Sequence, residues 1–165
     1  MNKIHKSNLA KTAIYLLEEV KNSKFNMDAY ALEKNGNWIP PMSLASKYKE
    51  CGTVCCFAGH APMALKINQK SKTWKTISWV AYVKEIFGTG ESENDWKFLF
   101  SFGWANLRKQ AAARAVVFLE SGVPEGWEGW NFDNKFLPRA TNKQLIERLR
   151  PFVISKHLNQ SNPTL

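Results

Sequence analysis

Apolar residues recur at three- and four-residue spacing in several stretches of this chain, which predicts α-helices. The first such stretch opens at Ser7, a residue type that often caps helix N-termini, and it ends at Asn22-Ser23. Its apolar positions are Leu9, Ala13, Leu16, Leu17 and Val20. These positions share one helical face, so we expect this face to pack against the core.

Helical periodicity disappears near residues 25–50. Asn35-Gly36 is a turn dipeptide, and Pro40-Pro41 is incompatible with a helix interior. We therefore expect a long ordered loop, which can include a short hairpin around the Asn-Gly turn. Loops of this length in a compact domain are often functional.

Three further helices are expected in the middle of the chain. The first runs from Thr53 to about Leu65 and is apolar nearly all round, which predicts a buried helix. The next covers residues 77–86 and ends at Phe87-Gly88. The third begins at Ser92 or Glu93.

Two more helices are expected towards the C-terminus. An alanine-rich helix covers residues 107–119, and Gly122 is placed to form a left-handed cap after it. Thr141 caps the last helix, which Pro151 can kink. Its buried face consists of Leu145, Leu149, Phe152 and Val153. We therefore predict a mainly α protein, a compact bundle of about six helices in one domain (1–158) with a polar tail (159–165).

The composition suits a globular domain with its own core. The chain has 165 residues, of which 44% are hydrophobic, and a chain of this length needs no disulfides to hold a core. No apolar stretch is long enough to span a membrane, and the polar start lacks the apolar segment of a secretion signal. Three cysteines within six residues do not form a disulfide framework. We expect a cytoplasmic protein with no membrane partner.

The formal net charge is +9, with the basic residues concentrated in parts of the chain. Such clusters are either an ordinary solvated face or a surface for nucleic acid or another anionic partner. The candidate basic surface consists of Lys70, Lys72, Lys75, Arg108, Arg114, Arg148 and Arg150.

A second candidate surface is the aromatic set Trp127, Trp130 and Phe132. Tryptophan is enriched at binding hot spots, and the alternative for this set is ordinary core packing.

The segment from Cys51 to His60 is the sharpest local feature, and three interpretations of Cys51, Cys56 and His60 remain open. They can simply pack a buried helix, since free cysteine is usually buried. They can be three ligands of a zinc ion, although the chain supplies no obvious fourth. Cys51 can also be a nucleophile at a helix start. In a helix His60 would lie about 13 Å from Cys51 along the axis, so His157 would have to be the base.

This segment resembles a known sequence pattern. Its Cys-Gly-Thr, Cys56 and Gly59-His60 are similar to the Cys-Gly-Thr-x-x-Cys-x-x-Gly-His pattern of a family of small uncharacterised phage and prophage proteins. The likeness covers about residues 8–130, and Cys55 departs from it. Its second half rests on Trp96, Leu99-Phe100, Trp104, Ala111-Ala112-Ala113-Arg114 and Gly122-Val123-Pro124.

The resemblance implies a phage or prophage origin and action in a bacterial cytoplasm, and it carries over no catalytic residue. We therefore expect an accessory protein that binds a host factor without catalysis, for example in counter-defence. One alternative is a basic nucleic-acid-binding protein. Another is a metal site, small-ligand site or thiol enzyme centred on the Cys/His segment, with zinc as its cofactor in the metal case. The target and the oligomeric state are left open.

Overall fold

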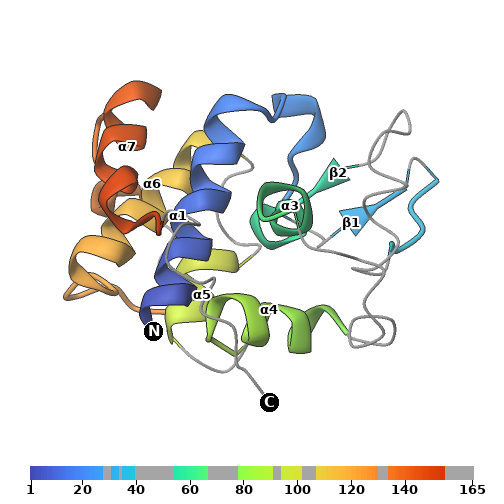
Figure 1. Ribbon diagram of the computed structural model, residues 1–165, viewed down its shortest axis with the longest axis horizontal. Coiled ribbons are helices and arrows are strands. Elements are labelled where there is room, and N and C mark those ends of the chain that lie inside the picture. The colour runs from blue at the N-terminus through green and yellow to red at the C-terminus, as the bar shows by residue number, and fades with distance from the viewer. Residues whose placement is uncertain are drawn as a thin grey trace, which may run out of the picture.

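Helix α1 (Lys3–Glu18) runs through the middle of the fold (Figure 1). It contacts α3 (Phe57–Ala64), α4 (Trp79–Phe87), α6 (Arg108–Ser121) and α7 (Asn142–Leu149). The computed structural model describes residues 1–27, 31–33, 35–39, 54–66, 78–90, 94–101, 107–129 and 134–154. In Figure 1, α6 and α7 lie on one side of α1, and α3 and α4 lie on the other. Helix α5 (Asn94–Phe100) packs against α6.

The described residues form six α-helices, which confirms the predicted mainly α bundle. Besides α1 they are α3 (Phe57–Ala64), α4 (Trp79–Phe87), α5 (Asn94–Phe100), α6 (Arg108–Ser121) and α7 (Asn142–Leu149). Three short 3-10 helices join them: η1 (Asn22–Lys24), η4 (Asn134–Phe136) and η5 (Arg150–Phe152). Strands β1 (Ala31–Leu32) and β2 (Val54–Cys55) form a small antiparallel pair. No described helix has the length and apolarity that crossing a membrane requires.

The start of the first helix was predicted wrongly. Asn2 is the N-cap, and its side-chain oxygen accepts a hydrogen bond from the backbone N–H of His5 at 2.9 Å. Ser7 instead lies inside α1 and is buried, where its hydroxyl oxygen accepts a hydrogen bond from the backbone N–H of Ile154 at 2.9 Å. The polar residue therefore ties α1 to the end of the described chain rather than starting the helix. The helix also ends earlier than predicted, at Glu18.

The start of α3 was also predicted wrongly. Thr53 lies outside the described residues, and the helix begins only at Phe57, with Cys56 as its N-cap. The preceding residues, Val54–Cys55, are extended because they pair with Ala31–Leu32 of β1. A strand pairing with a segment distant in sequence therefore delays the helix, although the apolar composition alone favours it earlier.

Two local signals at helix ends were predicted correctly. Gly88 ends α4 in the left-handed conformation, at φ 70° and ψ 25°. Thr141 starts α7 with a complete capping box, in which Gln144 is the partner.

Gly122 has a positive φ of 81°, but its ψ of −159° is not that of the predicted left-handed cap. Pro151 does not kink α7, because the helix has already ended at Leu149 and the proline lies in η5.

The predicted hairpin around Asn35-Gly36 is present, while residues 40–50 of the loop lie outside the described part. The backbone N–H of Glu33 donates to the Asn37 carbonyl at 2.9 Å, and that of Ile39 donates to the Ala31 carbonyl at 3.1 Å. Gly36 provides the positive φ, 84°, that the turn requires. The hairpin lies at the edge of the molecule farthest from α7 (Figure 1).

Arg108 joins the start of α6 to the end of α1. Its Nη1 donates to the carbonyls of Leu16 and Leu17 at 2.9 and 3.2 Å, and its Nε donates to Oδ1 of Asn22 at 2.8 Å. The last carbonyls of a helix have no partner within that helix. The guanidinium therefore acts as a C-terminal cap supplied by another helix.

We expect Arg108→Ala to lower the free energy of unfolding by about 2 kcal/mol, since it removes several charge-assisted hydrogen bonds. Urea denaturation followed by circular dichroism measures this change. Lys109→Ala, at the exposed neighbouring position, is the control and should stay within about 0.5 kcal/mol of the parent. Equal stability of the two variants would contradict the capping role.

Candidate functional site

His60 lies in the protein core. Its side chain is fully buried, and its Nε2 lies 3.2 Å from the carbonyl oxygen of Lys24, to which it donates a hydrogen bond. Its ring stacks on Phe25 with centroids 6.1 Å apart and planes 14° apart, and Tyr15 lies at 6.3 Å. Burial lowers the pKa of His60 to about 4, although the hydrogen bond to Lys24 partly opposes this shift. The imidazole is therefore neutral at physiological pH and joins α3 to Lys24, the last residue of η1.

The two described thiols are buried beside this histidine. Burial raises the pKa of Cys56 to about 11, and burial together with the neighbouring Cys56 thiol raises the pKa of Cys55 further. Both groups are therefore protonated near neutral pH, and a protonated thiol is a poor nucleophile and metal ligand. The backbone of Cys55 also forms an isolated β-bridge with that of Phe25, and the backbone N–H of Asn26 donates to the Cys55 carbonyl at 3.0 Å. Cys55, Cys56 and His60 thus form a structural junction.

Cys51, the candidate nucleophile or first ligand, lies outside the described residues. Within the described ranges, no three His, Cys, Asp or Glu side chains gather as a metal site would require. The structure places Cys56 at the N-cap of α3, and its carbonyl accepts a hydrogen bond from the backbone N–H of His60 at 3.2 Å. Zinc binding stays a prediction, because it depends on Cys51.

The predicted basic surface does not exist as one patch among its described members. Arg114 is fully buried in α6, so its assignment to a surface is wrong: α6 is covered by α1, α5 and α7. Burial lowers the pKa of Arg114 to about 9, so the group keeps its charge at neutral pH. Arg108 caps α1, as described above. Arg150 is exposed, and Lys70, Lys72 and Lys75 lie outside the described residues.

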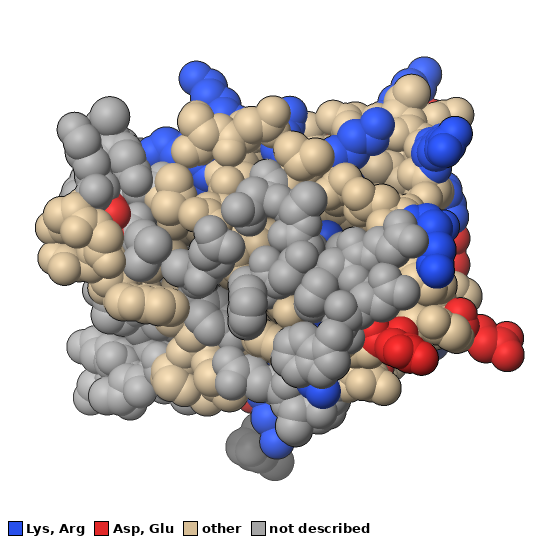
Figure 2. Space-filling model, turned by 180° about the vertical axis from the view of Figure 1, so that it is seen from behind, with Lys and Arg blue, Asp and Glu red and all other residues tan. Residues whose placement is uncertain are grey.

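Arg148 lies at the surface but is paired. Its Nε and Nη2 donate to the two carboxylate oxygens of Glu120 at 2.8 and 2.5 Å. The guanidinium holds the pKa of Glu120 below its usual range. Figure 2 shows Lys and Arg side chains along the upper edge and over the α6 and α7 side, with acidic side chains gathered below them. On this face, the described basic side chains are therefore spread out rather than arranged as a continuous track.

The predicted aromatic interface is wrong for Trp127. This residue is buried, and its ring meets Phe98 edge-on, with centroids 5.3 Å apart. The loop after α6 folds back and places the indole in the core, so the core-packing alternative applies to it. Trp130 and Phe132 lie outside the described residues.

Trp38 is an exposed aromatic residue that the sequence analysis did not select. Its side chain is 62% exposed, whereas its neighbour Ile39 is 1% exposed. The indole Nε1 of Trp79 donates to the Ile39 carbonyl at 2.9 Å and so fixes the hairpin to the start of α4. The available signal was the alternation of side chains in an extended arm, which turns Trp38 outward when Ile39 turns inward.

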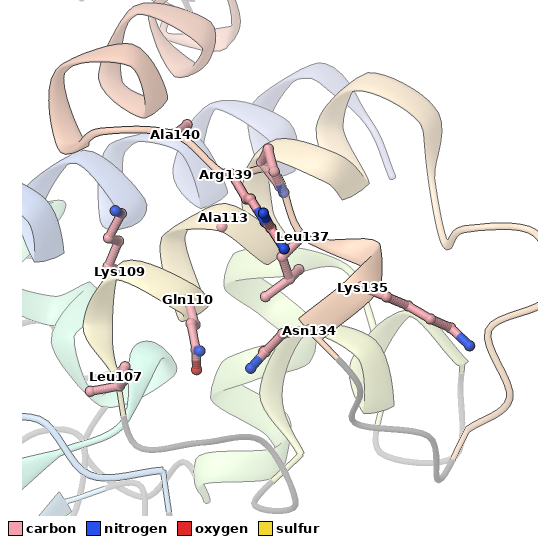
Figure 3. A pocket seen from close by; sticks show the side chains of 10 residues that line it. Leu107, Lys109, Gln110, Ala113, Asn134, Lys135, Leu137, Arg139 and Ala140 are labelled. Carbon is pink, nitrogen blue, oxygen red and sulfur yellow. The ribbon is translucent and has the colours of Figure 1, made fainter.

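The second feature missed in the sequence is a cavity of about 680 Å³ between the first turn of α6 and residues 134–140 (Figure 3). Lys109 and Arg139 contribute cationic groups to its lining, Lys135 lies at its rim, and Gln110 and Asn134 contribute amides. None of the residues lining it is acidic. These side chains come from two segments, 107–113 and 134–140, that lie about twenty residues apart in the sequence. No local motif therefore reveals the cavity.

Comparison with models of known protein families gives no match, and searches of curated proteins and of solved structures give no match either. The described residues define the class of structure: a mainly α-helical protein with an exposed tryptophan on a short hairpin and a separate cavity lined by cationic side chains.

Proposed function

We propose that this chain is a non-catalytic binding protein that engages a bacterial host protein through the hairpin of residues 31–39, with Trp38 as the anchor. The observation that carries the proposal is the exposed indole of Trp38 on a firmly held hairpin. Tryptophan is enriched among the residues that contribute most to protein interfaces. The resemblance to phage and prophage proteins supplies the bacterial host as the setting.

The hairpin is held in place before any partner arrives. Its two arms are joined by the hydrogen bonds of Glu33 and Ile39, β1 pairs with β2, and Trp79 holds the Ile39 carbonyl. A rigid loop loses little conformational entropy on binding, so more of the contact energy appears as affinity. The partner surface that fits is an apolar pocket for the indole with acidic residues around it, since this chain carries a net charge of +9.

The Cys/His junction supports a binding function rather than thiol catalysis at Cys55 or Cys56. Both thiols have raised pKa values, and the His60 ring is neutral and buried. The nucleic-acid alternative is less well supported. Arg114 is buried, and Arg108 and Arg148 already form hydrogen bonds within the fold.

The proposal is tested with immobilised parent protein, Trp38→Ala and Ile4→Ala in bacterial lysate. Ile4 is the control because it is 59% exposed and lies in α1, away from the hairpin. We expect one host protein to be retained by the parent and by Ile4→Ala but lost with Trp38→Ala. Calorimetry with that purified protein should then show affinity reduced by at least about 30-fold, which corresponds to the loss of about 2 kcal/mol that marks a hot-spot residue.

Two results would contradict the proposal. Capture that is unchanged by Trp38→Ala would show that the hairpin is not the docking surface. Capture that disappears after nuclease treatment and weakens steeply with salt would instead favour the nucleic-acid alternative.

A further inference from the structure

The cavity beside the start of α6 is built from elements other than the hairpin and has its own chemistry. One wall is the first turn of α6, with Lys109 and Gln110, and the other is formed by residues 134–140. In Figure 3, Lys109 and Arg139 lie towards one end of the cavity wall, whereas Gln110 and Asn134 lie towards the other. Its volume of about 680 Å³ falls within the range of small-molecule sites.

One end of the cavity favours an anion. Within the described part of the chain, neither the ammonium of Lys109 nor the guanidinium of Arg139 has an ion-pair or hydrogen-bond partner, and no acidic side chain lines the cavity. An arginine presents several N–H donors in a planar fork that matches phosphate oxygens. Lys135 adds charge at the rim, where its Nζ lies 5.1 Å from the Phe136 ring centre and points away from the cavity in Figure 3.

The helix dipole of α6 acts in the same direction. Leu107 is the N-cap and offers no side-chain oxygen to the first-turn N–H groups, and that turn contains no acidic residue. Leu107, Lys109 and Gln110 all line the cavity, so the positive end of α6 forms part of its wall.

The other end favours a ligand that also forms neutral hydrogen bonds. Oε1 of Gln110 is buried and has no hydrogen-bond partner in the described structure. A buried polar atom without a partner is unfavourable, and a ligand N–H or O–H would satisfy it. The amide of Asn134 converges on the same space in Figure 3. Between the two ends, Ala113 and Leu137 provide apolar wall against which a ring can pack.

We propose that this cavity binds a nucleoside monophosphate, with the phosphate at Lys109 and Arg139 and the edge of the base at Gln110 and Asn134. The cationic end matches the phosphate of such a ligand, the apolar wall matches the flat face of its base, and the amide end matches the edge of that base. Inorganic phosphate would use only the first end, and a nucleoside only the other two. This site is independent of the host-protein proposal, because it shares no residue with the hairpin.

Isothermal titration calorimetry tests the site with the four nucleoside 5′-monophosphates, the matched nucleosides and inorganic phosphate. We expect one monophosphate to bind in a one-to-one complex, and its nucleoside and inorganic phosphate each to bind at least about tenfold more weakly. Lys109→Gln/Arg139→Gln should weaken the monophosphate by at least about tenfold. Gln110→Leu should weaken the monophosphate but leave inorganic phosphate unchanged.

Lys143→Gln is the matched control, because Lys143 is exposed on α7 and does not line the cavity. It should bind as the parent does, and circular dichroism of every variant checks that the fold is retained. Three results would overturn the proposal: no binding of any monophosphate, inorganic phosphate bound as tightly as the monophosphates, or an oligonucleotide bound more tightly with increasing length.

Discussion

Phe57→Ala is expected to lower the free energy of unfolding by about 4 kcal/mol, within the range for a buried phenylalanine truncated to alanine. Phe57 is 1% exposed and is the first residue of α3. Its ring lies 6.0 Å from that of Phe87 and 5.6 Å from that of Phe100, centroid to centroid. It therefore joins the last residues of α4 and α5 to the start of α3. Alanine would leave a cavity where three helices meet.

Urea denaturation followed by circular dichroism measures this loss. Phe57→Leu is the matched variant, because it keeps most of the apolar volume and removes the ring contacts. It should cost about 1.5 kcal/mol. If Phe57→Ala were no more destabilised than Phe57→Leu, the three-ring contact would not be a main support of the core.

Local sequence signals predicted helix ends well when the helix and its cap were the only participants. Gly88 and Thr141 are examples, because a left-handed glycine and a capping box are decided by neighbours in sequence. The start of α3 could not be found in this way. Val54–Cys55 is extended because it pairs with β1, more than twenty residues earlier in the chain, and helix propensity contains no information about that pairing.

Burial of charged and aromatic residues was harder to predict than secondary structure. Arg114 lies in the predicted helix, but only the packing of α1, α5 and α7 around α6 decides that its side chain is covered. Trp38 and Trp127 show the same difficulty, since one is exposed and the other is buried although both follow a turn that contains a positive-φ glycine. The cavity could not be predicted either, because Lys109 and Arg139 meet only through the fold.

The Cys/His segment, the sharpest local pattern in the sequence, is a structural junction over its described part. The backbone of Cys55 forms a β-bridge with Phe25, Cys56 is the N-cap residue of α3, and His60 donates a hydrogen bond to the Lys24 carbonyl. Small residues, thiols and a histidine in such a pattern can therefore have a structural role. Here they hold β2, α3 and the end of η1 together. The proposed binding surfaces, the hairpin and the cavity, both lie outside this segment.

This role of His60 has a measurable consequence in acid. Burial lowers its pKa from an ordinary 6.5 to about 4, so the folded protein favours the neutral ring and the unfolded chain binds the proton first. The stability contribution is complete above pH 6.5 and is lost as the pH falls towards 4. We expect a loss of about 2 kcal/mol between pH 7 and pH 5 and about 3 kcal/mol by pH 4.

Urea denaturation at a series of pH values from 7 to 5 isolates this effect, because the Glu120 carboxylate, whose pKa is lowered from 4.5, contributes only at lower pH. His60→Gln keeps an N–H donor for the Lys24 carbonyl but cannot titrate. It should be less stable than the parent at pH 7 and should lose little further stability by pH 5, so the two curves converge. His5→Gln removes another histidine while His60 stays intact, so it should follow the parent curve. A parent whose stability does not change over this range, or a His60→Gln variant with the parent's slope, would show that the buried imidazole does not govern acid stability.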